Sequence, residues 1–207
     1  MKFSLLTIIF CLSLSVYGQQ TAEPSRLTPL QYVVLNDASR LTQWPKGTKQ
    51  QVKVATQFLK QVMTPGSDVG SLANFSDVEV SLDVVNSTNP DDLATKLVSK
   101  GRGGTAVYNS IVSSVRWLSK QESPGRRKVV FVFSDGEDDA SQISLKDAIK
   151  AVQTMHIPVF VIAPSVVERK RPGKNMKQLA VAAGGQAYFV DDSNGFDFAL
   201  LKRDLAR

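Results

Sequence analysis

The feature that most constrains the fold is an almost uninterrupted apolar segment in the second half of the chain. Residues 128–133 read Lys-Val-Val-Phe-Val-Phe and are followed directly by Ser134-Asp135-Gly136. A strand that is apolar on both sides is typical of the centre of a parallel sheet, where helices cover both faces. Further strands are predicted at 31–35, 69–75, 78–84, 159–163 and 187–190.

Segments with helical periodicity separate most of these strands. The spacing of their apolar residues predicts helices at 49–63, 91–99, 105–118, 144–155, 176–183 and 196–205. Strands that alternate with helices predict an α/β fold, here a doubly wound, mostly parallel sheet of the Rossmann-like kind with helices on both faces. The 207 residues contain no internal repeat, which favours one domain.

The beginning of the chain has the pattern of a secretory signal. Lys2 precedes an apolar run from Phe3 to Val16, and Val16 and Gly18 are the small residues of a cleavage site. The run is shorter than the ~20 apolar residues that span a bilayer. We therefore interpret residues 1–18 as a cleaved signal peptide rather than a retained anchor.

The remaining sequence divides into a linker and one domain. Residues 19–29 are polar and contain two prolines, which indicates a linker, and residues 30–207 form the predicted domain. No later segment is apolar enough to predict a transmembrane helix. A secreted or periplasmic location follows from the signal peptide.

Cysteine and histidine usage excludes several kinds of site. The chain has one cysteine, Cys11 in the apolar run, and one histidine, His156. A disulfide framework, a cysteine-rich zinc site and a site with several histidines are therefore excluded. The net charge of +6, from 25 basic and 19 acidic residues, indicates little about partners by itself.

Polar residues follow two of the predicted strands where each strand ends. Asp37 and Ser39 follow the strand at 31–35, Asp135 follows the strand at 128–133, and Thr105 opens a predicted helix. Ligands of such sheets bind beyond the carboxyl ends of the strands. Carboxylate and hydroxyl oxygens suit a hard cation such as Mg²⁺.

These residues stand in motifs that resemble the von Willebrand factor type A domain family. The motifs are Asp37-Ala-Ser39, Gly103-Gly-Thr105-Ala-Val-Tyr-Asn and Val-Phe-Ser134-Asp135-Gly136-Glu-Asp. The resemblance extends over about residues 30–207, and the sequence is most similar in these motifs to secreted bacterial members of the family. It implies a metal-ion-dependent adhesion site in which Asp37, Ser39, Thr105 and Asp135 bind Mg²⁺ or Mn²⁺, the two carboxylates partly through water. It also implies a protein partner that presents an acidic residue to the ion.

The first motif departs from the family pattern. The family has Asp-x-Ser-x-Ser, whereas Leu41 occupies the position of the second hydroxyl and Arg40 adds a positive charge. Thr42 is one residue late, and we expect that it would need a loop rearrangement to take this place. Three hypotheses remain: a non-enzymatic adhesion module that uses a cation, a metal-independent interaction domain with a degenerate site, and, as the least favoured, an enzyme.

Other polar segments are predicted to be solvated. Glu137, Asp138 and Asp139 extend an acidic loop, and the basic run at 168–174 predicts a loop after the strand at 159–163. No aromatic residues interleave with the basic run, so nucleic acid is not an expected partner. No nucleophile and base are paired in the sequence, so we do not expect an enzyme. The oligomeric state is not predicted.

Overall fold

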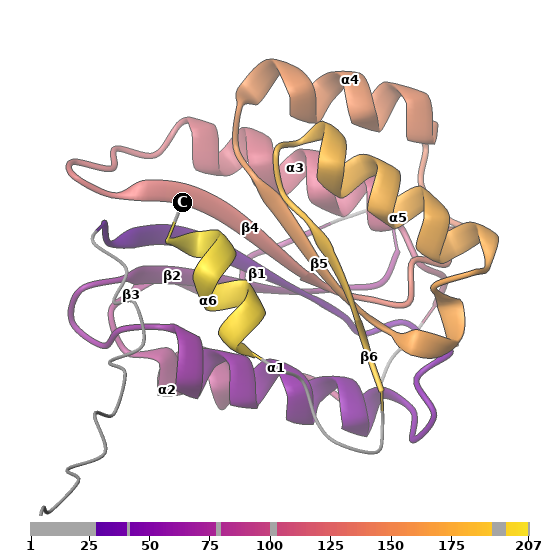
Figure 1. The fold of residues 1–207 in the computed structure, drawn as a ribbon, viewed down its shortest axis with the longest axis horizontal. Helices are drawn as coiled ribbons and strands as arrows, with labels where there is room; N and C mark the ends of the chain where they lie inside the picture. Colours follow the sequence, from indigo (N-terminus) through magenta and orange to yellow (C-terminus); the bar gives the residue numbers. More distant parts are fainter. Residues whose placement is uncertain (1–27, 41, 78–79, 100–102, 192–197, 207) are drawn as a thin grey trace, which may run out of the picture.

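Six strands form one sheet in the order β3-β2-β1-β4-β5-β6 (Figure 1). The structure is a computed structural model and describes residues 28–40, 42–77, 80–99, 103–191 and 198–206. All neighbouring strands are parallel except β3, which runs antiparallel to β2. The strands are β1 (Leu30–Asp37), β2 (Val69–Phe75), β3 (Val84–Ser87), β4 (Arg127–Phe133), β5 (Val159–Pro164) and β6 (Ala187–Val190).

Helices cover both faces of this sheet (Figure 1). One face carries α3 (Val107–Ser119), α4 (Leu145–Met155) and α5 (Arg171–Ala182), and the short 3₁₀ helix η1 (Ser165–Val167) precedes α5. The other face carries α1 (Thr48–Val62), α2 (Pro90–Ala94) and α6 (Phe198–Leu205). The doubly wound α/β fold predicted from the sequence is therefore confirmed.

The apolar central strand supplies side chains to both layers. In β4, Val130 and Val132 belong to the core under α3, α4 and α5, whereas Phe131 and Phe133 belong to the core under α1 and α6. Phe58 of α1 packs on Phe131, with ring centroids 4.6 Å apart. Since successive residues of a strand point to opposite faces, both sides of β4 must be apolar.

The register brings the ends of three strands together. Asn36 of β1 is opposite Asn74 of β2 on one side and Phe133 of β4 on the other. The loops that follow β1 and β4 therefore leave the sheet side by side. This arrangement places Asp37 next to the segment that begins at Ser134.

The predicted strand at 78–84 is wrong. Residues 80–83 are in no strand, residues 78–79 lie outside the described part, and β3 begins only at Val84. Val80 and Leu82 are partly buried against the core under α3 and α4. Their alternation therefore reflects core packing of an irregular segment rather than a sheet ladder.

The predicted helix at 91–99 is too long, because α2 ends at Ala94. The main-chain carbonyls that follow accept hydrogen bonds from side chains elsewhere. Asn74 Nδ2 donates to the Lys96 carbonyl over 2.9 Å, and Asn36 Nδ2 donates to the Val98 carbonyl over 3.0 Å. These side-chain donors compete with helix continuation.

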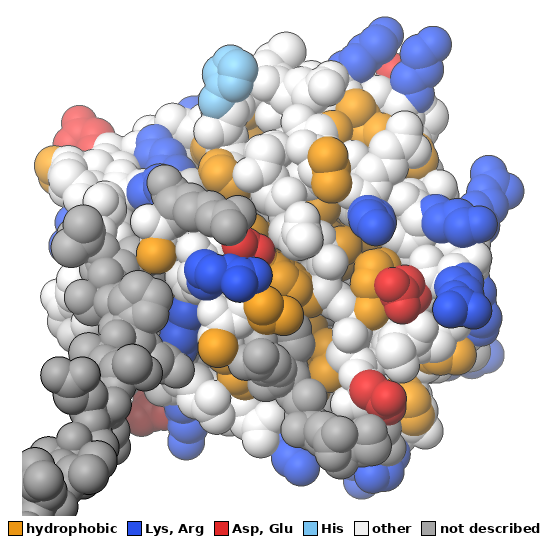
Figure 2. Space-filling model, in the orientation of Figure 1, with side chains coloured by type: hydrophobic (Ala, Val, Ile, Leu, Met, Phe, Trp, Pro, Cys, Tyr) orange, Lys and Arg blue, Asp and Glu red, His pale blue; other side chains and the backbone are white. Residues whose placement is uncertain are grey.

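The basic run is wrongly predicted as a loop throughout, because α5 begins at Arg171, five residues before the predicted start. Pro172 lies in the first turn, where its missing N–H costs no helical hydrogen bond. Lys and Arg side chains gather on the right of Figure 2, over the region of α5 in Figure 1. The prediction of solvent exposure is correct for Arg171, Lys174 and Lys177. The other predicted strands and helices agree with the described elements within two residues.

The predicted signal peptide, residues 1–18, lies outside the described residues, as does most of the predicted linker at 19–29. The first described strand starts at Leu30, the predicted start of the domain. Among the described helices, none combines the length and apolar character needed to cross a bilayer.

Candidate metal centre

Asp37 is the buried carboxylate at the end of β1. Its side chain is 3% exposed, and Oδ1 accepts a hydrogen bond from the Ser39 main-chain N–H over 3.0 Å. The Ser39 hydroxyl also donates to this carboxylate, and the Ser134 hydroxyl donates to Oδ2 over 2.7 Å. Ser39 and Ser134 are themselves 1% and 0% exposed. The first loop and the end of β4 are therefore joined through Asp37.

Burial raises the pKa of Asp37 from 3.8 to about 6. The hydrogen bonds from Ser134 and Ser39 act in the opposite direction, and the nearby charge of Asp135 adds to the increase. Desolvation therefore outweighs the hydrogen bonds, because a carboxylate loses more hydration than these donors return. A bound cation would reverse this balance.

Asp135 follows Ser134 and is 1% exposed. Its oxygens accept hydrogen bonds from the main-chain N–H groups of Gln43, over 2.5 Å, and Glu137, over 3.0 Å. Burial is again the largest effect and raises the pKa of Asp135. Neither Asp37 nor Asp135 forms a salt bridge with a described Lys, Arg or His.

Thr42 lies beside Asp135. Its hydroxyl donates a hydrogen bond to the Asp135 carboxylate and accepts one from the Trp44 main-chain N–H over 3.3 Å. Leu41, which occupies the family's second hydroxyl position, lies outside the described residues. The structure thus places a hydroxyl beside Asp135 one residue after that position.

Thr105 comes from a third loop and is 4% exposed. Its main-chain N–H donates to Asp139 Oδ1 over 2.6 Å, and its carbonyl accepts the main-chain N–H groups of Asp139 and Ala140, both over 3.1 Å. At the preceding Gly104, a Cβ would lie 2.6 Å from the same Asp139 oxygen, so a larger residue there would displace this carboxylate from the Thr105 N–H. Thr105 is therefore fixed against the loop after Asp135.

Asp138 is half-buried, contrary to the predicted solvated loop, whereas Asp139 is exposed as predicted but also accepts a hydrogen bond. Asp138 Oδ2 accepts the Tyr108 main-chain N–H over 3.0 Å and the Ser141 hydroxyl over 2.7 Å. Together with the Asp139 contact to Thr105, these bonds tie the loop after β4 to the start of α3. Glu137 remains exposed, as predicted.

A cavity of about 390 Å³ opens among these loops, and we call it the acidic pocket. Asp37 and Ser39 do not line it, but they are connected to it through Ser134 and Asp135. It is lined by Thr42, Gln43, Thr105, Asp135, Glu137, Asp138 and Asp139. The structure thus gathers all four predicted ligand residues at one end of the sheet.

The donor set fits a hard cation. Among the described residues, no group of three or more His, Cys, Asp or Glu side chains is arranged to hold a metal ion. A site here therefore depends on hydroxyl oxygens beside the two carboxylates Asp37 and Asp135. Oxygen-only coordination with retained water is typical of Mg²⁺ and Mn²⁺.

Sequence reasoning missed two residues that hold the site together. Ser134 was present in the third motif but was not assigned a role, although its hydroxyl bonds to Asp37. Gln43 bridges neighbouring segments: its amide accepts from Lys170 Nζ over 2.7 Å and donates to Glu137 over 3.3 Å. No sequence signal identifies Gln43, because its partners are distant along the chain.

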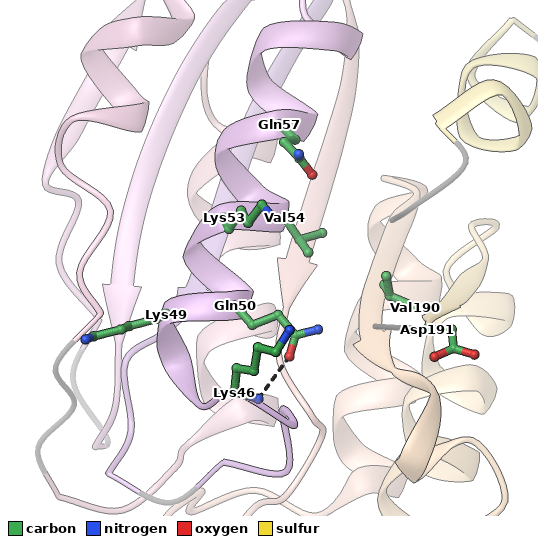
Figure 3. Close-up of a pocket in the computed structure, with 8 residues that line it drawn as sticks. All are labelled: Lys46, Lys49, Gln50, Lys53, Val54, Gln57, Val190 and Asp191. Carbon is green, nitrogen blue, oxygen red and sulfur yellow. Dashed lines mark hydrogen bonds between the residues drawn. The ribbon is translucent and has the colours of Figure 1, made fainter. Parts of the chain in front are cut away.

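A second cavity of about 340 Å³ lies between α1 and the end of β6 (Figure 3). We call it the lysine pocket, lined by Lys46, Lys49, Gln50, Lys53, Val54, Gln57, Val190 and Asp191. It contains none of the predicted ligand residues. In Figure 3, Lys49 points away from β6, whereas Val54 points toward it.

Solved structures share this fold at low sequence identity. BatB, a conserved hypothetical protein from Bacteroides thetaiotaomicron, is 16% identical with a TM-score of 0.61, over 86% of this chain and 97% of that one. The proximal thread matrix protein 1 of the mussel byssus, whose structure is described as having a zinc-occupied MIDAS motif, is 16% identical with a TM-score of 0.61. Here the coverage is 86% of this chain and 48% of that one.

The pilus adhesin SpaC from Lactobacillus rhamnosus GG gives a TM-score of 0.63 at 10% identity, over 88% of this chain and 30% of that chain. The chain thus spans less than half of the byssus protein and of the adhesin.

No curated protein sequence matches the chain. The sequence model of the von Willebrand factor type A domain matches residues 33–201, which is most of the chain. The chain therefore belongs to the von Willebrand factor type A domain family.

Proposed function

We propose that this protein is a secreted or periplasmic interaction module that binds Mg²⁺ or Mn²⁺ and, through the ion, an acidic residue of a partner protein. The proposed role as a protein-interaction module is supported by the family and by structural neighbours that include a byssus matrix protein and a pilus adhesin. The location rests on the N-terminal sequence pattern.

The observation that carries the proposal is the burial of Asp37 beside Asp135, with no basic partner among the residues that the structure describes. Both carboxylates are at most 3% exposed, and burial raises the pKa of each. Burying carboxylates without a compensating charge is costly. A divalent cation at this place would compensate both.

Both candidate carboxylates already accept hydrogen bonds. Asp37 accepts from Ser39 and Ser134, and Asp135 accepts from Gln43, Glu137 and Thr42. Since a carboxylate has about four lone-pair sites, each can still contact an ion directly or through water. Ser39 and Thr105 contribute hydroxyl oxygens, and Thr42 takes the role of the second hydroxyl that Leu41 lacks.

A bound cation would supply a Lewis-acidic position that a carboxylate of the partner can occupy. The acidic pocket gives room for this group, because Thr105 and Asp135 both line it. The residues of this chain orient the ion's shell and exclude bulk water from Asp37. This role requires no nucleophile and no general base, and we propose a non-enzymatic function.

The test is calorimetric titration of the purified chain with Mn²⁺ and Mg²⁺. Asp135→Ala should weaken Mn²⁺ binding at least ~100-fold, since metal affinity depends strongly on such ligand groups. Asp204→Ala is the matched control, because this acid lies on α6 and accepts from Tyr188. Unchanged Mn²⁺ affinity in Asp135→Ala would overturn the proposal. Absence of binding to the unaltered chain would instead favour the metal-independent alternative.

A further inference from the structure

A buried glutamine of α1 contacts the main chain of the first ligand loop. Gln51 is 1% exposed, and its Nε2 donates to the Asp37 carbonyl over 2.7 Å and to Asn36 Oδ1 over 2.9 Å. Within the described part of the chain, the buried Gln51 Oε1 has no hydrogen-bond partner. The contacts of this amide are therefore made by its Nε2 group, toward β1.

The hydrogen bonds fix Asp37 on both sides of its main chain. Gln51 holds the Asp37 carbonyl, and the next main-chain N–H, of Ala38, donates to the Phe75 carbonyl over 2.7 Å. The Asp37 carboxylate is meanwhile bound to Ser39 and Ser134. The direction in which the loop leaves β1 is therefore set by contacts to α1 and β2.

The same network continues away from α1. Asn36 is fully buried, and its Nδ2 donates to Asn74 Oδ1 over 2.8 Å and to the Val98 carbonyl over 3.0 Å. The Val98 N–H donates to the same Asn74 oxygen over 2.9 Å. Side chains at the ends of β1 and β2 thus connect α1 to the segment that follows α2.

We infer that Gln51 and Asn36 are positioning residues for the metal centre. Gln51 orients the main chain of Asp37, and Asn36 anchors this contact to Asn74 and to residue 98. The inference rests on the proposed cation binding at Asp37. It assigns to the α1 face a role in metal affinity beyond its packing on the sheet.

A purely structural glutamine would lower stability without changing metal affinity. The chain offers a matched control in Gln31, at the opposite end of β1. Gln31 is 5% exposed, its Nε2 donates to Asn86 over 3.4 Å, and its buried Oε1 likewise has no hydrogen-bond partner in the described segments. Gln31→Met and Gln51→Met each remove a buried side-chain amide. Gln31 lies on the α3 side of β1, because it alternates with Leu30 and Tyr32 on the α1 side, and it contacts neither Asp37 nor Asn36.

The experiment measures Mn²⁺ affinity by calorimetry and the melting temperature in chelator for both variants. We expect Gln51→Met to weaken Mn²⁺ binding by about tenfold or more, as for other groups that orient metal ligands, and Gln31→Met to leave it unchanged. Gln51→Asn, which withdraws the amide by one methylene, should weaken binding less and provides the readout if Gln51→Met does not fold.

Equal Mn²⁺ affinity in the Gln51 variants and the unaltered chain would overturn the inference while leaving the proposed function intact. An equal loss in Gln31→Met and Gln51→Met would also overturn it, because the effect would then be general. If the unaltered chain binds no Mn²⁺, the proposed function fails and the inference fails with it.

Discussion

Two pockets near the carboxyl ends of the strands have similar volumes and opposite charge. The acidic pocket measures about 390 Å³ and the lysine pocket about 340 Å³. At the acidic pocket, the Asp37 and Asp135 carboxylates are buried. Main-chain N–H groups and serine hydroxyls donate hydrogen bonds to them. In the lysine pocket, Lys46, Lys49 and Lys53 are exposed.

The two pockets differ in whether their charged groups are desolvated and held in a fixed orientation. Asp37 and Asp135 are desolvated, and their positions are fixed by hydrogen bonds from several loops. Exposed lysines keep much of their hydration, and ordering their long side chains on binding costs entropy. The two pockets are therefore similar in volume and both are lined by charged side chains, but the acidic pocket has charged groups whose orientation is fixed by hydrogen bonds.

The largest effect should come from removing the charge of Asp37. We expect Asp37→Asn to weaken Mn²⁺ binding at least ~100-fold, because it removes a carboxylate from the proposed ligand set. The folded-state pKa of about 6 lies above the ordinary 3.8, so the proton stabilises the metal-free fold at low pH. This stabilisation is lost as the pH rises from about 4 to above 6. Relative to Asp37→Asn, the metal-free chain should therefore lose about 3 kcal/mol over this range.

Urea unfolding in chelator at a series of pH values measures this difference, with Asp204→Asn as the control for removing an acid elsewhere. Parallel pH profiles for the unaltered chain and Asp37→Asn would contradict the prediction. The Asp37 carboxylate would then be no more desolvated than the exposed charged groups of the lysine pocket.

A smaller effect is expected at Thr42. Thr42→Val keeps the shape of the side chain but removes the hydroxyl that donates to Asp135. We expect about tenfold weaker Mn²⁺ binding, equivalent to one hydrogen bond of about 1.4 kcal/mol. Thr42→Ser should restore most of the affinity in the same titration. Equal affinities for Val and Ser variants would show that the hydroxyl has no part in the centre.

The smallest effect is expected in the lysine pocket. Lys46→Gln and Lys53→Gln should change the free energy of unfolding by no more than ~0.5 kcal/mol, since the side chains are exposed. At physiological salt, Mn²⁺ affinity should change by less than about twofold because exposed charges are screened. Urea unfolding and Mn²⁺ titration check both values. A tenfold change in affinity would mean that the two pockets are coupled.

The sequence was sufficient to predict the parallel sheet because its strands are strongly apolar. The apolar strand at 128–133 and the helices before and after it were predicted from the local spacing of apolar residues, which can be read from the sequence alone. The β3 strand was misplaced because Val80 and Leu82 alternate like a strand but pack as loop residues. Local pattern alone does not distinguish these two environments.

Part of the candidate centre was also predictable. Asp37, Ser39, Thr105 and Asp135 stand at strand ends and helix starts in family motifs, so their proximity followed from the fold. The contributions of Thr42 and Gln51 did not follow, since each depends on the three-dimensional path of a loop or the turn of a helix. Hydrogen bonds across 14 residues or more, such as that from Gln51, leave no short-range signal.

The shortness of β3 and β6 limits how the sheet itself can engage another chain. Each outermost strand has four residues, so few unpaired main-chain groups are offered for strand addition. Short border strands also protect a sheet protein against self-association through its backbone. Strand addition at either border of the sheet would therefore form few main-chain hydrogen bonds.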